Sequence, residues 1–221
     1  MADPSPADPA TLAQIRRLPH SIRPVVVCDV DEVVLHFIRH LEIFLDRQGF
    51  AFAEPVYRLK GNIRRRDGSL ADDATVQSLI AGFFEDECGN QQLVDGAAEA
   101  LDALSASADI VLLTNLPGAA NRPVRQRLLA EYGIAYPLVT NVGPKGGAVA
   151  AIASGRSGPL VFIDDSPLNI RSVRASLAGA VLVHFVADPR FLASCEPIEG
   201  VGLKTNDWAE VRTYIEALLQ A

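Results

Sequence analysis

Two aspartates directly follow an apolar run near the beginning of the chain. Asp29 and Asp31 come after Val25–Cys28 in the segment VVVCDVDEVV. A second acidic pair, Asp164 and Asp165, follows another apolar run in LVFIDDSPLNI. Carboxylates that are brought together repel one another unless a cation lies between them, and oxygen ligands are the ones that Mg²⁺ prefers. The two pairs therefore predict a Mg²⁺ site, provided that the fold brings them together.

Three further polar residues have the chemistry to bind a phosphate group. Thr114 and Asn115 follow the apolar run in IVLLTNLPG, and Lys145 lies in VGPKGGAV. An ammonium group neutralises phosphate charge, and hydroxyl and amide groups donate hydrogen bonds to its oxygens. The glycines beside Lys145 lack the spacing of a nucleotide-binding P-loop, so the lysine is interpreted as part of a site shared with the acidic pairs.

Short apolar runs alternate with helical patterns along most of the chain. The predicted strands are Val25–Cys28, Ile110–Leu113, Leu138–Val139, Leu160–Ile163 and Val181–Phe185. The predicted helices are Gly96–Ser105, Asn121–Glu131, Lys145–Ala153, Pro167–Ala178 and Asp207–Leu219. Strands that are apolar on both faces are typical of parallel sheets covered by helices. The order predicts an α/β fold with a Rossmann-like, doubly wound parallel sheet, whose strand ends bring the polar residues to one crevice.

A long segment after the first strand interrupts this alternation. At about 60 residues it is too long for a plain loop. Helical spacing at His36–Arg47 and Thr75–Glu87, on either side of the polar, turn-rich stretch Lys60–Ser69, predicts a small α-helical cap. The predicted division is a loosely tied leader, a core and a cap, which take residues 1–23, residues 24–35 with 94–221, and residues 36–93 respectively.

Composition and charge exclude several classes of protein. Of the 221 residues, 49% are hydrophobic and 21% are charged, which is too apolar for a chain without a core. The net charge of -7 argues against binding to nucleic acid or to an anionic membrane. No stretch approaches the roughly 18 apolar residues of a membrane span, and no secretory signal is recognisable. Because three cysteines cannot all pair with one another, a reducing cytoplasmic location is expected.

The order of these motifs resembles that of the haloacid dehalogenase superfamily, in its phosphatase branch. The segments DVDEVV, LLTN, GPKGG and IDDSPLN correspond to the four motifs of that family and occur in the same order. Phosphorylated receiver domains also combine carboxylates with a lysine, but their order differs and they have no helical insertion after the first strand. The resemblance covers about residues 24–185 and equates the insertion with the helical cap of the family.

The resemblance implies a role for each motif residue. Asp29 is the nucleophile that forms an aspartyl-phosphate, and Asp31 is first the general acid and then the general base. Thr114 and Asn115 donate hydrogen bonds to the phosphoryl oxygens, and Lys145 neutralises charge on the nucleophile and the phosphoryl group. Dehalogenating members of the family lack an aspartate at the position of Asp31, so its presence favours phosphate esters.

The resemblance also implies how Mg²⁺ is held. Its ligands are the carboxylate of Asp29, the backbone carbonyl of Asp31 and the carboxylate of Asp165, with Asp164 in or near the coordination shell. A carboxylate attacks a phosphate dianion poorly unless cations screen the repulsion, so this chemistry needs both the metal and the lysine.

Other residues have two interpretations each. Glu32 stands where the family usually has glycine, so its side chain is expected to narrow the entrance to the site or to repel some phosphates. His36 and His40, four residues apart on a predicted helix, have the spacing of metal ligands, but ordinary surface or core histidines are the favoured interpretation. A run of three arginines either contacts an anionic leaving group or forms a solvated basic turn; these residues are Arg64, Arg65 and Arg66.

The sequence thus predicts a cytoplasmic enzyme that hydrolyses a small-molecule phosphate monoester with Mg²⁺ as cofactor. The expected partner is a small phosphorylated metabolite, and neither nucleic acid nor membrane is expected. Two alternatives stay open: a noncatalytic protein of the same fold that binds a ligand or a partner, and a phosphotransferase to an acceptor other than water. The sequence predicts neither the substrate nor the oligomeric state.

Overall fold

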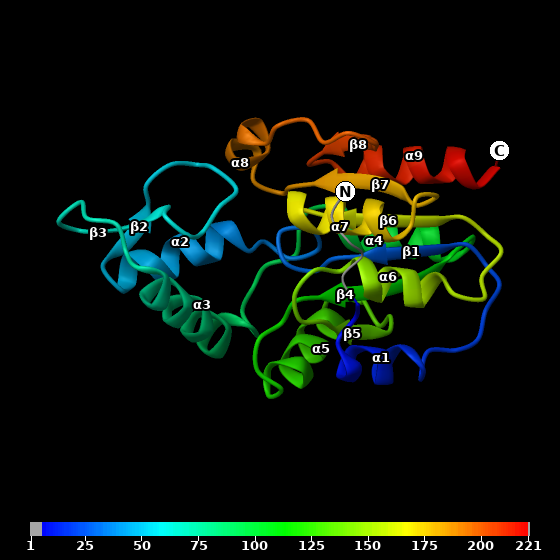
Figure 1. Cartoon of the computed structure of the whole chain (residues 1–221), viewed down its shortest axis with the longest axis horizontal. Helices are drawn as coiled ribbons and strands as arrows, with labels where there is room; N and C mark the ends of the chain where they lie inside the picture. The colour runs from blue at the N-terminus through cyan, green and yellow to red at the C-terminus, as the bar shows by residue number, and fades with distance from the viewer. Residues whose placement is uncertain (1–5, 221) are drawn as a thin grey trace.

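A six-stranded parallel sheet forms the centre of the molecule (Figure 1). The computed structural model describes residues 6–220. In sheet order the strands are β5 (Leu138–Thr140), β4 (Asp109–Thr114), β1 (Val25–Cys28), β6 (Leu160–Asp164), β7 (Val181–Phe185) and β8 (Val201–Thr205). Because β1 pairs with both β4 and β6, the residues that follow these three strands emerge side by side. This confirms the predicted doubly wound α/β sheet and adds the edge strand β8.

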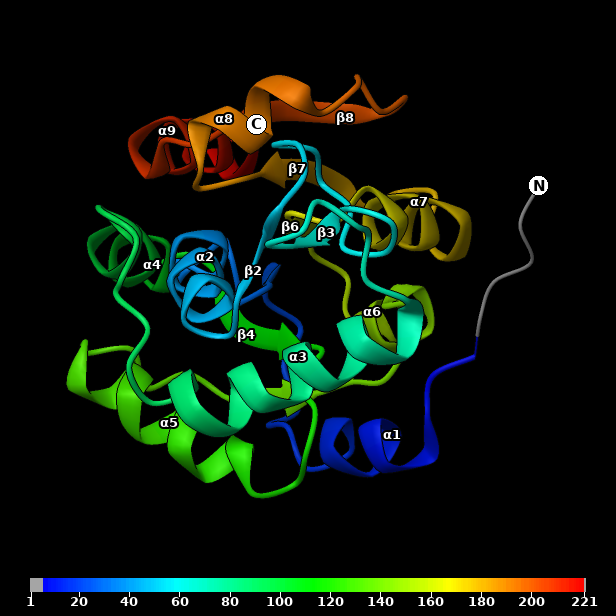
Figure 2. The ribbon, with the colours of Figure 1, turned by 90° about the vertical axis from the view of Figure 1, so that its left-hand side faces the viewer.

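Helices cover both faces of the sheet (Figure 2). One face packs against α4 (Ala97–Ser105), α5 (Asn121–Glu131) and α9 (Trp208–Gln220). The other face packs against α6 (Gly146–Ala153) and α7 (Pro167–Ser176). Successive residues of β1 alternate between the two cores, which is why the whole strand is apolar. Within residues 6–220, no helix has the length and apolarity to cross a membrane.

Residues 38–87 fold as a unit at the carboxyl ends of the strands (Figure 1). This cap segment contains α2 (Ile38–Arg47), α3 (Asp73–Glu87) and an antiparallel hairpin of β2 (Phe50–Phe52) with β3 (Ile63–Arg65). The two helices match the expected ones and residues 60–69 keep turns on either side of β3, but the hairpin itself was not predicted. The strands of the hairpin have three residues each, which is too short for their alternation to stand out in the sequence.

The segment before β1 is tied to the core more closely than a loose leader. Its helix α1 (Pro9–Ile15) lies beside the edge strand β5, with the side chain of Thr11 buried. The Thr11 hydroxyl donates to the carbonyl of Thr140 at 3.0 Å. The Gln14 amide donates to the same carbonyl at 3.1 Å and accepts from the Thr140 N–H at 3.0 Å. Residues 1–5 of the predicted leader and residue 221 of the predicted core lie outside the described residues.

We expect Gln14→Ala to lower the free energy of unfolding by about 1–2 kcal/mol, because it leaves the N–H of Thr140 without its partner and removes one of the two donors to the Thr140 carbonyl. Urea denaturation measures the change. Gln77→Ala, at an exposed position of α3, is the matched control and should change the free energy by less than about 0.5 kcal/mol. Equal losses in the two variants would contradict the interpretation of α1 as a docked helix.

Candidate active site

Three buried carboxylates meet at the carboxyl ends of β1 and β6. Asp29, Asp164 and Asp165 each offer a carboxylate oxygen, and these oxygens all lie within 4.8 Å of one another. The backbone N–H of Asp29 donates to the carbonyl of Ile163 at 2.9 Å, which extends the pairing of β1 with β6 by one residue. Adjacent parallel strands therefore bring Asp29 together with Asp164 and Asp165, which lie far from it in the sequence.

Lys145 lies between two of these carboxylates. Its Nζ atom is 2.7 Å from Oδ1 of Asp29 and 2.7 Å from Oδ2 of Asp164, and its side chain is fully buried. The lysine is placed by the close packing of α6 on α7 at Gly146. A Cβ atom at Gly146 would lie 2.4 Å from the carbonyl oxygen of Ser172, so this close approach requires glycine.

The charges of this cluster do not balance. Burial raises the pKa of Asp29 to about 7, although Lys145 acts in the opposite direction. Burial and the neighbouring Asp29 raise the pKa of Asp165 well above its usual value. Burial disfavours the charged form of Lys145, but the adjacent Asp164 and Asp29 outweigh it and raise the pKa of the lysine. Three carboxylates thus share one ammonium group, and a further cation would relieve the remaining repulsion.

The two aspartates after β6 have different partners. Asp164 accepts hydrogen bonds from the N–H of Ser166 at 2.9 Å and from the amide of Asn169 at 3.0 Å, so it holds the loop before α7 as well as Lys145. The backbone carbonyl of Asp165 lies 2.9 Å from Nε2 of His184, which fixes the backbone while the carboxylate lies near Asp29. Asp165 is therefore the freer metal ligand of the two.

Asp31 lies in a separate polar network. Its Oδ1 accepts from the guanidinium of Arg125 at 2.9 Å and from the amide of Gln91 at 2.9 Å. Its Oδ2 is 3.4 Å from the hydroxyl of Thr114. Arg125 is fully buried and also donates to Oε1 of Gln91 at 2.6 Å. The network fixes the orientation of the Asp31 carboxylate beside the end of β4.

The two polar residues at the end of β4, Thr114 and Asn115, are placed differently. Thr114 is buried at the end of the strand, next to Asp31. The side chain of Asn115 instead bridges to the loop after β5: its amide donates to the carbonyl of Gly143 at 2.9 Å, and its Oδ1 accepts from Asn141 at 2.9 Å. Thr114 thus lies with the acidic residues, while the Asn115 amide holds the loop that leads to Lys145.

Glu32 does not narrow the entrance, contrary to expectation, because its side chain is fully buried. One carboxylate oxygen accepts from the N–H groups of Phe37 at 3.0 Å and Ile38 at 2.7 Å, and the other accepts from the N–H of Asp188 at 2.6 Å. Its φ of 62° lies in the left-handed region, which favours glycine. The three hydrogen bonds offset this backbone strain and tie the start of α2 to the start of α8 (Pro189–Ser194).

The other candidates lie away from the acidic cluster. His36 and His40 belong to no metal-competent group among the described residues, and Nε2 of His40 accepts from the N–H of Gln92 at 3.0 Å. A cavity of about 300 Å³ lies at the hairpin beside Gly49 and Gly68. The three arginines line this cavity; contact with a leaving group was one of their two interpretations, beside a solvated basic turn, and they are Arg64, Arg65 and Arg66.

Sequence reasoning missed several residues of the site. For Arg125 a signal exists, because Leu128 and Leu129 follow it at helical spacing and place it on the buried side of α5. Gln91 and His184 carry no such signal. Gln91 lies in the connection after α3, and His184 is the one polar residue in an otherwise apolar strand. The hydrogen-bonding role of Glu32 depends on a chain reversal that no local pattern predicts.

Comparison of the whole chain with known proteins identifies its fold. No family model matches the chain, and no curated protein sequence is similar enough to match it. Among solved structures, a haloacid dehalogenase family hydrolase from Deinococcus radiodurans with bound phosphate and sodium superimposes with a TM-score of 0.61 at 17% identity, covering 90% of this chain and 98% of that chain. This likeness establishes the shared fold and agrees with the family resemblance of the motifs.

Two further structures agree with this result. A haloacid dehalogenase-like hydrolase from Streptococcus pneumoniae has a TM-score of 0.59 at 13% identity, covering 86% of this chain and 97% of that chain. A D,D-heptose 1,7-bisphosphate phosphatase from B. bronchiseptica, in complex with magnesium and phosphate, has a TM-score of 0.52 at 16% identity. The superposition covers 90% of this chain and 99% of that chain. Each comparison spans nearly the whole of the other chain.

We expect Arg125→Met to lower the free energy of unfolding by about 3 kcal/mol, because it leaves Asp31 without the cation that compensates it. Chemical denaturation measures the change. The control is Arg127→Met, an exposed arginine on the same helix, which should cost less than about 0.5 kcal/mol. If both variants lose the same amount, the ion pair does not stabilise the fold.

A second expectation concerns Glu32, whose pKa burial raises to about 7. In the unfolded chain the pKa of this carboxyl is close to 4.5. Between about pH 4.5 and pH 7, the folded state therefore holds a proton that the unfolded state has lost. The stability that this proton contributes is present at low pH and is lost as the pH rises through about 7. We therefore expect the difference in unfolding free energy between wild type and Glu32→Gln to fall by about 2 kcal/mol from pH 5 to pH 8.

Denaturant titrations of both proteins at each pH, without metal, test this expectation. Both proteins keep the carboxylates of the acidic cluster, so the difference reports residue 32 together with its effect on Asp165. A difference that does not change with pH would show that Glu32 is ionised throughout this range.

Proposed function

We propose that the chain hydrolyses a phosphate monoester with Mg²⁺ as cofactor, through an aspartyl-phosphate on Asp29, as a member of the haloacid dehalogenase superfamily. The observation that carries the proposal is the buried cluster of Asp29, Asp164 and Asp165 around Lys145. The structural likeness to a phosphatase that binds magnesium and phosphate supports it. The expected partner is a small phosphorylated metabolite, because a cap segment of residues 38–87 lies at the same ends of the strands as the acidic cluster.

The residues of the cluster fit Mg²⁺. They offer only oxygen atoms, they are buried, and the three carboxyl groups share a single ammonium group. The carboxylates of Asp29 and Asp165 would hold the ion together with the backbone carbonyl of Asp31, while Asp164 is engaged by Lys145 and Asn169. When bound, the ion supplies positive charge that reduces the repulsion between Asp29 and a phosphate dianion.

In the first step, a carboxylate oxygen of Asp29 forms a bond to phosphorus as the bond from phosphorus to the leaving oxygen breaks. Lys145 is in direct contact with this carboxylate and neutralises charge that builds up on the phosphoryl oxygens. The Thr114 hydroxyl is available to donate to one of those oxygens. Asp31, in its protonated form, gives its proton to the departing alkoxide, so that an alcohol leaves.

In the second step, water hydrolyses the aspartyl-phosphate. Asp31, now ionised, removes a proton from water as the water oxygen attacks phosphorus, and the bond between phosphorus and Asp29 breaks. Inorganic phosphate leaves, and Asp29 is restored as a carboxylate. Arg125 and Gln91 hold the Asp31 carboxylate in one orientation, which favours its use in both steps.

In the sequence, the acidic residue Glu32 in place of glycine is the one feature that favours a noncatalytic protein of the same fold. Its burial and its three backbone hydrogen bonds give it a structural role, so this support is removed. Transfer of the phosphoryl group to an acceptor other than water would use the same first step, and no contact described here favours it over hydrolysis.

We expect Asp29→Asn to abolish Mg²⁺-dependent hydrolysis of 4-nitrophenyl phosphate, with a loss of at least about 10³-fold in kcat, because an amide cannot form the acyl phosphate. Removal of Mg²⁺ by a chelator should stop turnover by wild type. Asp102→Asn, at an exposed position of α4, is the matched control and should keep full activity.

Mass spectrometry of the acid-quenched reaction adds a direct measurement. Wild type should carry one phosphoryl group that alkali removes, and the Asp29→Asn variant should carry none. Full activity of the variant would refute the role of Asp29, and retention of activity without Mg²⁺ would refute the role of the metal.

A further inference from the structure

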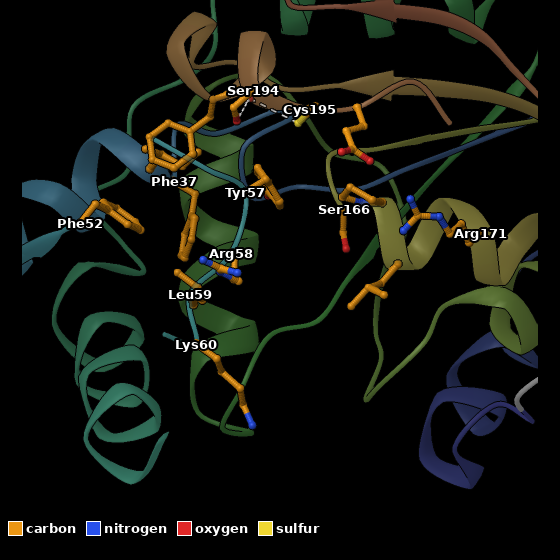
Figure 3. A pocket seen from close by; sticks show the side chains of 15 residues that line it. Phe37, Phe52, Tyr57, Arg58, Leu59, Lys60, Ser166, Arg171, Ser194 and Cys195 are labelled. Carbon is orange, nitrogen blue, oxygen red and sulfur yellow. Dashed lines mark hydrogen bonds between the residues drawn. The ribbon is translucent and has the colours of Figure 1, made fainter. Parts of the chain in front are cut away.

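A cavity of about 600 Å³ lies between the cap segment and the core (Figure 3). Phe37, Phe52, Tyr57 and Leu59 line it from the cap side. Ser166 and Arg171, from the start of α7, line it from the core side, together with residues of α8. A volume of this size suits a small organic molecule.

The cavity borders the acidic cluster. Ser166, on its core side, directly follows Asp165 in sequence, and its backbone N–H donates to Asp164. On the cap side, Phe37 is fixed through its N–H by the buried carboxylate of Glu32. A substrate whose phosphoryl group meets Asp29 would therefore extend its leaving group in this direction.

The walls of the cavity are mainly apolar and aromatic. The ring of Phe52, from the hairpin, packs edge-on against Phe191 of α8, with ring centroids 5.2 Å apart. This contact joins the cap segment to the core beside the cavity. Leu168 lies at the rim with 75% of its surface exposed, which leaves an apolar surface that a ligand can cover. An aromatic ring gains most from such walls, because it buries apolar area and pairs with other rings.

Cationic side chains add charge selectivity. Arg58, from the cap side, and Arg171, from the core side, both line the cavity, and neither forms an ion pair within residues 6–220. Lys60 also lines it but pairs with Asp73 at 2.9 Å. Glu196 is the one acidic residue of the lining. Two free guanidinium groups in a chain of net charge -7 mark this cavity as a place for an anion.

We infer that the cavity binds the leaving group of the substrate, and that this group is an aromatic ring with an anionic substituent such as a carboxylate. The inference rests on the proposed phosphatase function for the phosphoryl end, while the leaving-group end is argued from the cavity alone. The apolar walls hold the ring, and the planar guanidinium group of Arg171 on the core side binds the anionic substituent, while Arg58 adds positive charge on the cap side.

Binding of the leaving group alone tests the cavity without any turnover. The probe is 3-(4-hydroxyphenyl)propanoate, and its neutral amide is the matched comparison; calorimetry measures both dissociation constants. We expect the carboxylate to bind about tenfold more tightly than the amide, which corresponds to one good ionic hydrogen bond. Equal affinities, or no binding of either probe, would overturn the inference.

Variants locate the binding. Arg171→Met should weaken binding of the carboxylate about fivefold and leave binding of the amide unchanged, while Leu168→Ser should weaken both by about two- to threefold. Arg127→Met removes an exposed arginine on α5 and should change neither constant. If Arg171→Met and Arg127→Met have the same effect, the anion does not bind in this cavity.

Turnover separates the inference from the proposed function. The substrates are the phosphate ester of 3-(4-hydroxyphenyl)propanoate, phenyl phosphate and glycerol phosphate. We expect kcat/KM to fall in that order, with about a tenfold advantage of the first over the second that Arg171→Met reduces. Hydrolysis of all three at equal efficiency overturns the inference but keeps the phosphatase proposal. Tight binding of the probe without hydrolysis of any ester supports the cavity's ligand and overturns the phosphatase proposal.

Discussion

The contact of Lys145 with two buried aspartates is the constraint on which the rest of the site depends. Its ammonium group lies 2.7 Å from both Asp29 and Asp164, out of reach of water. A charge in this environment requires paired partners at short distance, so β1, β6 and the start of α6 must keep their positions relative to one another. The same arrangement leaves the Asp165 carboxyl without a cation of its own, so a bound cation would favour its ionised form.

The fold and the acidic cluster were predictable from sequence because both depend on local patterns. Apolar runs such as Val25–Cys28 identify central strands, and polar residues at the ends of parallel strands necessarily meet. The network of Asp31 with Arg125 and Gln91 was not predictable, because its members come from three separate segments and none has a motif. The short hairpin of the cap segment was not predicted for a different reason, since strands of three residues show almost no alternation of apolar and polar side chains.

Glu32 departs from the motif pattern, and its side chain has a structural role. From sequence, an acidic side chain in place of glycine suggests interference with an anionic substrate. In the fold, the side chain points inward and replaces water as the partner of three backbone N–H groups at the starts of α2 and α8. The cap segment is thereby attached to the core at the point where the chain enters it, close to the aromatic contact between Phe52 and Phe191.

The docking of α1 also affects how the molecule behaves in a crowded solution. β5 ends the sheet on one side, and an edge strand with free backbone groups invites pairing with a strand of another molecule. The amide of Gln14 meets both the N–H and the carbonyl of Thr140, as a neighbouring strand would. One glutamine side chain therefore closes this part of the edge, and loss of the helix would expose a template for intermolecular β-sheet growth and aggregation.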